Sequence, residues 1–425
     1  MFIMPLYNVL RAMVYDSPWW RDGFITLMII IVIFSVLLKH HKIRINKFDI
    51  LIILYFIYGA WGTATSDIPP NEALKIFRTY FYVVLLYFIA RYIFKKESNY
   101  YRFNKIIILI ALLLATDIII EWCFVNIFGL SRNYFPWVAY AAAHSNVQGF
   151  VSGSLSSTVR IGTFSGFPHV TLLLFGGLFI YLFPAQIYFN RRYVFKEKLG
   201  SFSRKKSGLG LMLILSICIF LGYVKLVIIM TILILSIYNI FFIKNSSIMI
   251  KYLIVIVLTF SILFFSIPAI LDRIVIFFHS TIDYIITYGM FPINYIKSWS
   301  FKDLFSHSFI TPKMATNDPF LGPFIGEVRI IQYTISFGLI WLFLLILIFF
   351  VALKKCLKGI LHDNSEKRYF FMGSFGFLVL YMADMFHYAL AVTIVNVEFL
   401  LIIIAAISSA KIHPNIVNVG SPQWK

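Results

Sequence analysis

Basic residues at the ends of long apolar segments are the side chains in this sequence whose type and spacing could do chemistry. They are Arg78, Arg160, Lys225, Arg273 and Arg329, with Lys75 close to the first of them. Guanidinium and ammonium groups gathered at one level would bind an anionic group, and a diphosphate with an apolar tail fits both the charges and their apolar surroundings. A lone arginine at a membrane boundary can instead reach toward lipid phosphates, so a binding site requires several of these residues at one level.

A group-transfer reaction at such a site also needs a side chain that accepts a proton. We favour Glu327 and His169, which stand close to the basic residues in the sequence, over Asp272 and His387. No cluster of Asp, Glu and His has the spacing of metal ligands, and the three cysteines form neither a disulfide framework nor a metal motif. The sequence therefore predicts chemistry without a metal ion or another cofactor.

The composition indicates what must position these side chains. Of the 425 residues, 60% are hydrophobic and only 13% are charged, whereas about a quarter of the residues in soluble domains are charged. A water-soluble chain of this length could not bury so much apolar surface. We therefore expect an all-α, polytopic integral membrane protein that forms a single transmembrane domain over residues 1–425.

Stretches of about 20 apolar residues, the length that crosses the hydrocarbon layer, predict eleven spans. They lie near 22–38, 48–64, 77–93, 106–128, 163–184, 209–223, 225–243, 252–271, 330–352, 369–387 and 391–409. The short pair 209–223 and 225–243 is either one hairpin or one bent element. The stretch that ends at Asp22 mixes charges with two tryptophans and is predicted to be an interfacial helix, although a twelfth span within it stays open.

The formal net charge of +19 reflects the topology of the chain. With the N-terminus outside, the inner segments carry 25 of the 37 Lys and Arg residues, which is the excess that cytoplasmic loops show. These segments are 39–47, 91–105, 190–208, 244–251, 354–368 and 411–425. The basic clusters are thus topological and do not indicate nucleic acid as a partner. The basic residues named first then lie on the outer side.

Two predicted outer loops are too long to be simple turns. They run from about 131 to 161 and from 272 to 328, whereas typical connections have about 4–6 residues. The second loop has apolar residues at helical spacing from Ile274 to Ile285, and we expect an amphipathic helix along the membrane surface there. Long ordered loops often carry function, and a lid with only a packing role is the alternative.

The segment RIGTFSGFPH, Arg160 to His169, leads into a predicted span. Gly162 and Gly166 would let the backbone approach a ligand closely, and Pro168 lies near a helix start, where free N–H groups favour anions. The segment resembles the Arg–x–Gly–Thr–Phe pattern, with a following Pro, of the bacterial O-antigen polymerase and O-antigen ligase superfamily. Similar agreement is found in GYVKLVIIMTILIL from Gly222, GEVRIIQYTISFGLIWLFLLIL from Gly326 and MFHYALAVTIVNVEFLLIII from Met385, so the resemblance covers roughly residues 45–410.

This resemblance implies a membrane-embedded glycosyltransferase of the GT-C-like class in the bacterial inner membrane. It would transfer a glycan from undecaprenyl diphosphate to a sugar hydroxyl on the periplasmic face, with inversion. Its partners would be the lipid-linked oligosaccharide, the lipid bilayer and a chain-length-regulating membrane protein. The chain departs from the family pattern at three positions: Lys225 stands where Arg is usual, His169 follows the proline in place of Asn, and Glu327 replaces the His of ligases.

Glu327 favours an O-antigen polymerase, which joins lipid-linked repeat units, over an O-antigen ligase, which transfers the glycan to lipid A–core. A lipid-linked oligosaccharide flippase or transporter is the alternative from another class. A flippase would place charges along a central cavity and often has repeated halves. Basic residues on one side and two long loops on that same side suit a one-sided enzyme better.

Four acidic residues fall inside predicted spans: Asp117, Glu121, Asp384 and Glu398. Acids within a membrane are candidates for function, and structural pairing with outer arginines such as Arg78 or Arg160 is an alternative of equal weight. Arg11 and Arg21, which belong to the predicted interfacial helix, are expected to tolerate alanine.

Overall fold

The computed structural model describes ten stretches of the chain. They are 19–38, 45–66, 68–131, 134–139, 168–188, 207–222, 224–242, 329–363, 367–385 and 394–412, with residues 9, 12, 13 and 254 described singly. These stretches are helical for most of their length and contain no β-strand. The predicted all-α class is confirmed for this part of the chain.

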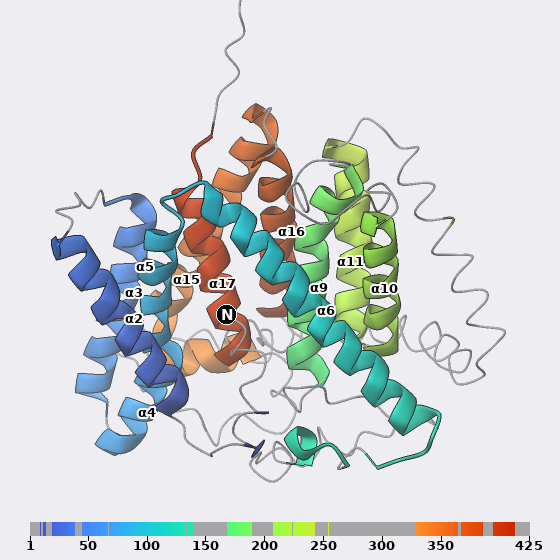
Figure 1. Cartoon of the computed structure of the whole chain (residues 1–425). Coiled ribbons are helices and arrows are strands. Elements are labelled where there is room, and N and C mark those ends of the chain that lie inside the picture. The colour runs from blue at the N-terminus through green and yellow to red at the C-terminus, as the bar shows by residue number, and fades with distance from the viewer. Residues whose placement is uncertain are drawn as a thin grey trace, which may run out of the picture.

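Helices joined at the two ends of a bundle make up the fold, as Figure 1 shows. In chain order they are α2 (Trp19–Leu38), α3 (Lys47–Thr65), α4 (Pro70–Tyr80), η1 (Tyr82–Val84), α5 (Leu85–Ile93), α6 (Ser98–Asn126), α9 (Pro168–Phe183), η3 (Pro184–Tyr188), α10 (Ser207–Gly222), α11 (Lys225–Ile237), η4 (Tyr238–Phe242), α15 (Arg329–His362), α16 (Lys367–Met385) and α17 (Ile394–Ser409). The turn η1 is a 3-10 helix, whereas η3 and η4 are π-helical extensions of α9 and α11.

Within these stretches, six helices are long and apolar enough to cross a membrane. They lie at Arg21–Leu38, Lys47–Thr65, Pro70–Ile93, Ser98–Asn126, His169–Gln186 and Ser336–His362. Four more predicted spans coincide with α16 and with the shorter apolar helices Gly210–Gly222, Leu226–Phe242 and Asn396–Ser409. The chain is therefore a helical membrane protein. The predicted span 252–271 and the loop 272–328 lie outside the described stretches, so the total of eleven spans stays a prediction.

The third span begins earlier than predicted, at Pro70 rather than at residue 77. Pro69 is the N-cap residue and Pro70 the first helical residue, and a proline in the first turn loses no intrahelical hydrogen bond. The chain then bends at Phe81 through η1 into α5. One predicted span thus consists of two short helices, and the first of them carries Arg78.

The helices α10 and α11 form a hairpin, which was one of the two predicted arrangements. A side chain added at Gly222 would overlap Leu172 in the first turns of α9, and one added at Gly208 would meet Gln186 beyond the end of α9. The helix α10 therefore runs antiparallel to α9. The chain reverses at Val224, which has extended backbone angles, and α11 returns along α9.

The helix α15 is interrupted at Gly338, whose φ of 84° and ψ of 165° are accessible mainly to glycine. The hydroxyl of Tyr58 donates a 2.6 Å hydrogen bond to the carbonyl of Phe337, just before the break. After the break, Trp341 donates from Nε1 to the hydroxyl of Tyr55 at 2.8 Å. Two tyrosines of α3 thus hold the two sides of the break. In Figure 1 the first turns of α15 lie across the bundle before the helix rises.

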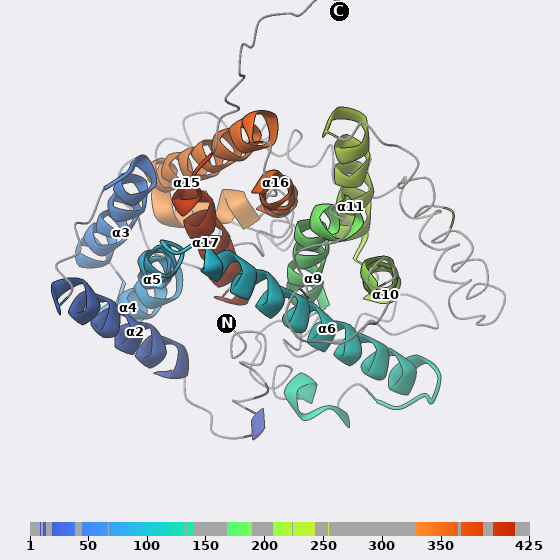
Figure 2. The ribbon, with the colours of Figure 1, turned by 45° about the horizontal axis from the view of Figure 1, so that its top comes forward.

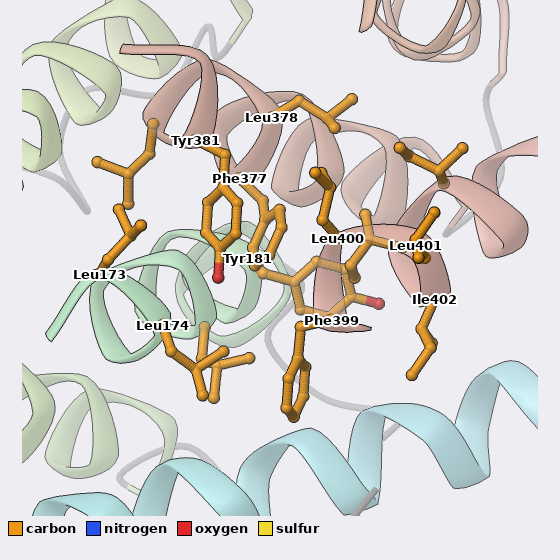
Figure 3. Packing of buried hydrophobic residues seen from close by; sticks show 14 of the residues in the cluster. Leu173, Leu174, Tyr181, Phe377, Leu378, Tyr381, Phe399, Leu400, Leu401 and Ile402 are labelled. Carbon is orange, nitrogen blue, oxygen red and sulfur yellow. The ribbon is translucent and has the colours of Figure 1, made fainter. Parts of the chain in front are cut away.

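The core centres on α9, α16 and α17, as Figure 3 shows. Phe377 and Tyr381 of α16 stack with their ring centroids 4.1 Å apart, next to Tyr181 of α9. A side chain added at Gly373 would overlap the backbone carbonyl of Tyr181, so glycine is needed for this close approach of α16 to α9. Small residues commonly let two membrane helices pack closely in this way.

The helices α2, α4, α9, α11, α15 and α17 begin at one end of the bundle, at the bottom of Figure 1. We call this the outer end, following the side that the charge distribution predicts, and the opposite end the inner end.

Figure 2 shows α2 at the edge of the bundle, beside α4 and α5. Only 11% of the span Arg21–Leu38 is buried inside the protein. The helix α2 is attached chiefly through its first turns, where Thr26 Oγ1 lies 2.6 Å from the hydroxyl of Tyr82.

A polar network joins α3, α5, α15 and α17 at the inner end. Asp49 completes a reciprocal cap at the start of α3, forms an ion pair with Arg91 and accepts a 2.9 Å hydrogen bond from the hydroxyl of Tyr87. Lys355 donates from Nζ to the carbonyl of Ser408 at 2.8 Å, which satisfies a carbonyl in the last turn of α17. No buried side-chain nitrogen or oxygen of these five residues lacks a hydrogen-bond partner. We call them the inner network.

Candidate functional site

Four charged residues meet in the outer part of the bundle, and they come from the first turns of α2 and α17 and the last turn of α4. Asp22 lies between two arginines: its Oδ1 accepts a 2.9 Å hydrogen bond from Arg21 Nε, and its Oδ2 forms an ion pair with Arg78 Nε at 2.8 Å. Arg21 also donates from Nη2 to the backbone carbonyl of Arg78 at 2.9 Å. Glu398 Oε1 lies 4.0 Å from Arg21 Nε. We call Arg21, Asp22, Arg78 and Glu398 the outer cluster.

The outer cluster is largely buried. The side chains of Arg21 and Glu398 are 9% and 2% exposed, whereas that of Arg78 is 26% exposed. Arg21 Nη1 and Glu398 Oε1 are buried and have no hydrogen-bond partner. Buried unsatisfied groups are rare in native proteins, and each costs about 1–3 kcal/mol. A group from outside the chain that completed these hydrogen bonds would therefore stabilise the cluster.

The cluster corrects the prediction for the beginning of the first span. Arg21 and Asp22 form the first turn of α2 and are not part of an interfacial helix. Arg21 is buried and paired, so it is not a peripheral side chain suited to serve as a tolerant control. The sequence did contain a signal, because charged residues at the entrance to a span are usually paired. One alternative for the acids inside predicted spans was pairing with an outer arginine such as Arg78 or Arg160. Glu398 does lie near an arginine, but that arginine is Arg21.

The helix α4 brings Arg78 beside the start of α15. The hydroxyls of Tyr80 and Tyr333 lie 3.4 Å apart, and their ring centroids are 5.5 Å apart. Tyr333 is about one turn beyond Arg329, the first residue of α15. The last turn of α4, which carries Arg78, thus lies beside the first turns of α15, whereas the Arg78 side chain itself pairs with Asp22 of α2. The structure describes the backbone of Arg329 and not its side chain.

The first turns of α17 also contact the start of α9. Asn396 donates from Nδ2 to the carbonyl of Val170 at 3.3 Å and accepts a 3.0 Å hydrogen bond from the hydroxyl of Tyr381. His169, the neighbour of Val170, is buried in the first turn of α9. Asn396 was not among the predicted site residues, although an amide inside the last predicted span was a signal for it.

Lys225 begins α11 at the same end of the bundle. Gly222, three residues before it, packs against Leu172, which is three residues after His169. The corner between α10 and α11 therefore lies beside the first turns of α9. Lys225 and His169 share this level of the bundle, and the side chain of Lys225 is not described.

The outer cluster and His169 lie on opposite sides of α17. Successive residues of an α-helix are rotated by about 100°, so Asn396 and Glu398 point to nearly opposite sides. Asn396 faces α9 and α16, whereas Glu398 faces α2. The structure therefore does not bring His169 together with Arg78.

Three predicted site residues lie outside the described stretches: Arg160, Arg273 and Glu327. The weaker candidates Asp272 and His387 also lie outside them. Their positions and roles stay predictions. Of the four acids inside predicted spans, Glu398 belongs to the outer cluster. The other three, Asp117, Glu121 and Asp384, are also buried.

The chain matches no protein-family model, no curated protein and no solved structure. The argument for function therefore depends on the residues and geometry of the outer end.

Metal binding was not predicted, and the described side chains include no group of three or more His, Cys, Asp and Glu that could hold a metal ion. Because Glu327 and Asp272 lie outside that set, metal independence stays a prediction.

An apolar cavity of about 30 Å³ lies inward of the outer cluster, between α3, α15 and α17. Tyr80 and Val397 line it, close in sequence to Arg78 and Glu398. A cavity of this size has room for about one or two water-sized groups. It is too small for a lipid tail, and we assign no ligand to it.

Proposed function

We propose that the chain is the polymerase of O-antigen or a related surface polysaccharide in the bacterial inner membrane. It transfers an undecaprenyl-diphosphate-linked glycan onto a sugar hydroxyl of another lipid-linked repeat unit on the periplasmic face. The observation that supports this proposal is that the first turns of α9, α11 and α15, which bear His169, Lys225 and Arg329, lie in the outer part of the same bundle as the last turn of α4, which bears Arg78. Basic residues at one level suit an anionic head group whose tail stays in the bilayer.

The proposed reaction breaks the bond between the anomeric carbon and the phosphate oxygen of the donor. The same carbon forms a bond to the acceptor hydroxyl oxygen, and attack opposite to the leaving group inverts the anomeric centre. The diphosphate departs with the bonding electron pair, so its charge grows and fixed cations stabilise the transition state more than the ground state. The residues proposed to hold it are Arg78, Arg160, Lys225, Arg273 and Arg329.

The hydroxyl proton must pass to a base as the new bond forms. Glu327 and His169 are the residues proposed for this role. His169 is buried in the first turn of α9, within the outer part of the bundle. Glu327 stands two residues before Arg329 in the sequence, close to one of the arginines proposed to hold the leaving group.

Two other functions compete with the polymerase. An O-antigen ligase uses the same donor with a lipid A–core acceptor, and Glu327 in place of the His of ligases favours the polymerase. A lipid-linked oligosaccharide flippase must open a polar path at both ends in turn. The inner network, in which buried polar groups are fully paired across four helices, gives less support to such a path.

Deletion of the gene, followed by gel electrophoresis of the surface polysaccharide, tests the proposal. Loss of a polymerase leaves single repeat units attached to the lipid core, and the wild-type gene restores the ladder. Loss of a ligase instead leaves the core without any repeat unit. A ladder that persists unchanged after deletion contradicts both activities.

A further inference from the structure

Within the outer cluster, Asp22 Oδ2 and Arg78 Nε are joined by an ion pair that lacks hydrogen-bond geometry, and two further buried polar atoms have no hydrogen-bond partner. Arg21 Nη1 is a buried donor without an acceptor, and Glu398 Oε1 is a buried acceptor without a donor. The two side chains are neighbours, since Glu398 Oε1 lies 4.0 Å from Arg21 Nε, yet they do not satisfy each other. A ligand that completes both must present an acceptor oxygen and a hydroxyl close together.

Asp22 sets the direction in which Arg21 points. Its carboxylate binds Arg21 Nε, and the carbonyl of Arg78 binds Arg21 Nη2, so two sides of the guanidinium are fixed. The remaining nitrogen, Nη1, is held in place without a partner. Such a fixed guanidinium loses little side-chain entropy when it binds an anion. Arg78 is the most exposed member of the cluster.

We propose that the outer cluster binds the sugar phosphate portion of a lipid-linked glycan, with a phosphate oxygen on Arg21 Nη1 and a sugar hydroxyl on Glu398 Oε1. This inference rests on the proposed function and adds Arg21 and Glu398 to the substrate-binding residues. A sugar phosphate carries both of the groups that the cluster lacks. A bare lipid phosphate offers no sugar hydroxyl, and a neutral sugar offers only an uncharged oxygen to the guanidinium.

Two lipids separate the two contacts: undecaprenyl diphosphate, and undecaprenyl diphosphate that carries one N-acetylhexosamine. Their affinities are measured on the purified full-length chain in phosphatidylcholine nanodiscs. Arg21→Lys keeps the charge and removes Nη1, so both lipids bind about 10-fold more weakly, the loss expected of one charge-assisted hydrogen bond. Glu398→Leu weakens only the sugar-bearing lipid, also by about 10-fold. Glu398→Gln keeps an acceptor oxygen and restores most of that loss.

Arg91→Lys is the matched control, because Arg91 pairs with an aspartate at the opposite end of the bundle. This variant should bind both lipids as the wild type does. Should Glu398→Leu fail to fold, the comparison of Arg21→Lys with Arg91→Lys decides by itself.

Three results overturn the inference while leaving the proposed function intact. The first is unchanged affinity in the Arg21 and Glu398 variants, and the second is an equal loss in Arg91→Lys. The third is displacement of the sugar-bearing lipid by an equal concentration of phosphatidylglycerol, which also carries a phosphate and hydroxyls. A wild-type chain that binds neither undecaprenyl lipid contradicts the proposed function itself.

Discussion

The inner network and the outer cluster are built from similar residues and differ in how completely they are paired. Each contains an aspartate that pairs with an arginine, Asp49 in the inner network and Asp22 in the outer cluster. In the inner network every buried side-chain nitrogen and oxygen has a hydrogen-bond partner. In the outer cluster Arg21 Nη1 and Glu398 Oε1 have none.

This difference separates a structural role from a binding role. A fully paired buried network stabilises one arrangement of the helices, whereas a partly paired one costs free energy until another group completes it. Two unsatisfied groups at about 1–3 kcal/mol each amount to a large fraction of the about 5–15 kcal/mol that stabilises a typical domain. Such a cost at the outer end is understandable if a ligand binds there.

The largest expected effect is on stability and comes from the inner network. Asp49→Ala leaves Arg91 without the Asp49 carboxylate and removes one half of the reciprocal cap of α3, so we expect the free energy of unfolding to fall by about 3–5 kcal/mol. Thermal unfolding of the purified protein in detergent measures this loss. Asp22→Ala should also destabilise the protein, and it alone should weaken binding of undecaprenyl diphosphate. If both variants bind the lipid equally well, the two regions do not differ in role.

The next effect is on transfer rather than on stability. Arg160→Ala and Arg329→Ala should each slow glycan transfer by roughly 10²-fold or more, because a charge-assisted hydrogen bond to the leaving group contributes about 1.5–3 kcal/mol and strengthens in the transition state. Lysine should restore only part of the rate, since it keeps the charge and loses the bidentate geometry. Polymer length and amount on gels, normalised to protein level, provide the measurement. Near-normal polymer from both alanine variants would rule out an arginine clamp on the diphosphate.

A smaller loss of stability is expected when a tyrosine that donates a hydrogen bond to a backbone carbonyl is replaced by phenylalanine. Tyr58→Phe removes the hydrogen bond to the carbonyl of Phe337, which the break at Gly338 takes out of the helical pattern, so we expect a loss of about 1–3 kcal/mol in stability. Tyr238→Phe is the matched control, because Tyr238 donates to the carbonyl of Met372 inside the regular helix α16. Its loss should be smaller, and denaturant titration of both variants shows whether it is.

The smallest effect is expected at the exposed ion pair between Glu97 and Lys367, near the inner end. Glu97 is 67% exposed, so solvent screens the pair. Glu97→Gln should change stability by no more than about 1 kcal/mol. A loss as large as that of Asp49→Ala in the same unfolding experiment would show that burial does not explain the strength of the inner network.

The hydrophobic pattern predicted most of the fold, because a lipid bilayer leaves an apolar run of about 20 residues few alternatives to a spanning helix. The break at Gly338 was not predicted, since a glycine inside an apolar run is also typical of close helix packing. The shift of the third span to Pro70 followed from two prolines whose preference for a helix start the span prediction did not use.

The candidate site was predicted only in part. The predicted ends of the apolar segments were enough to assign Lys225, His169 and Arg329 to the outer end, because that assignment does not depend on how the helices pack. The pairing of Arg21 with the backbone of Arg78 joins residues 57 positions apart, which no local pattern encodes. The separation of His169 from Arg78 by α17 depends on the order in which helices pack, and one sequence does not contain that order.

Reconstitution of the purified chain in liposomes with an undecaprenyl-diphosphate-linked repeat unit tests the proposed polymerase most directly. We expect a ladder of lengthening lipid-linked glycans, with one undecaprenyl diphosphate released for each new linkage. Activity should persist in EDTA, because basic side chains rather than a metal ion are proposed to hold the diphosphate. Movement of the intact lipid across the membrane without elongation, or elongation that depends on added Mg²⁺ or Mn²⁺, would contradict this account.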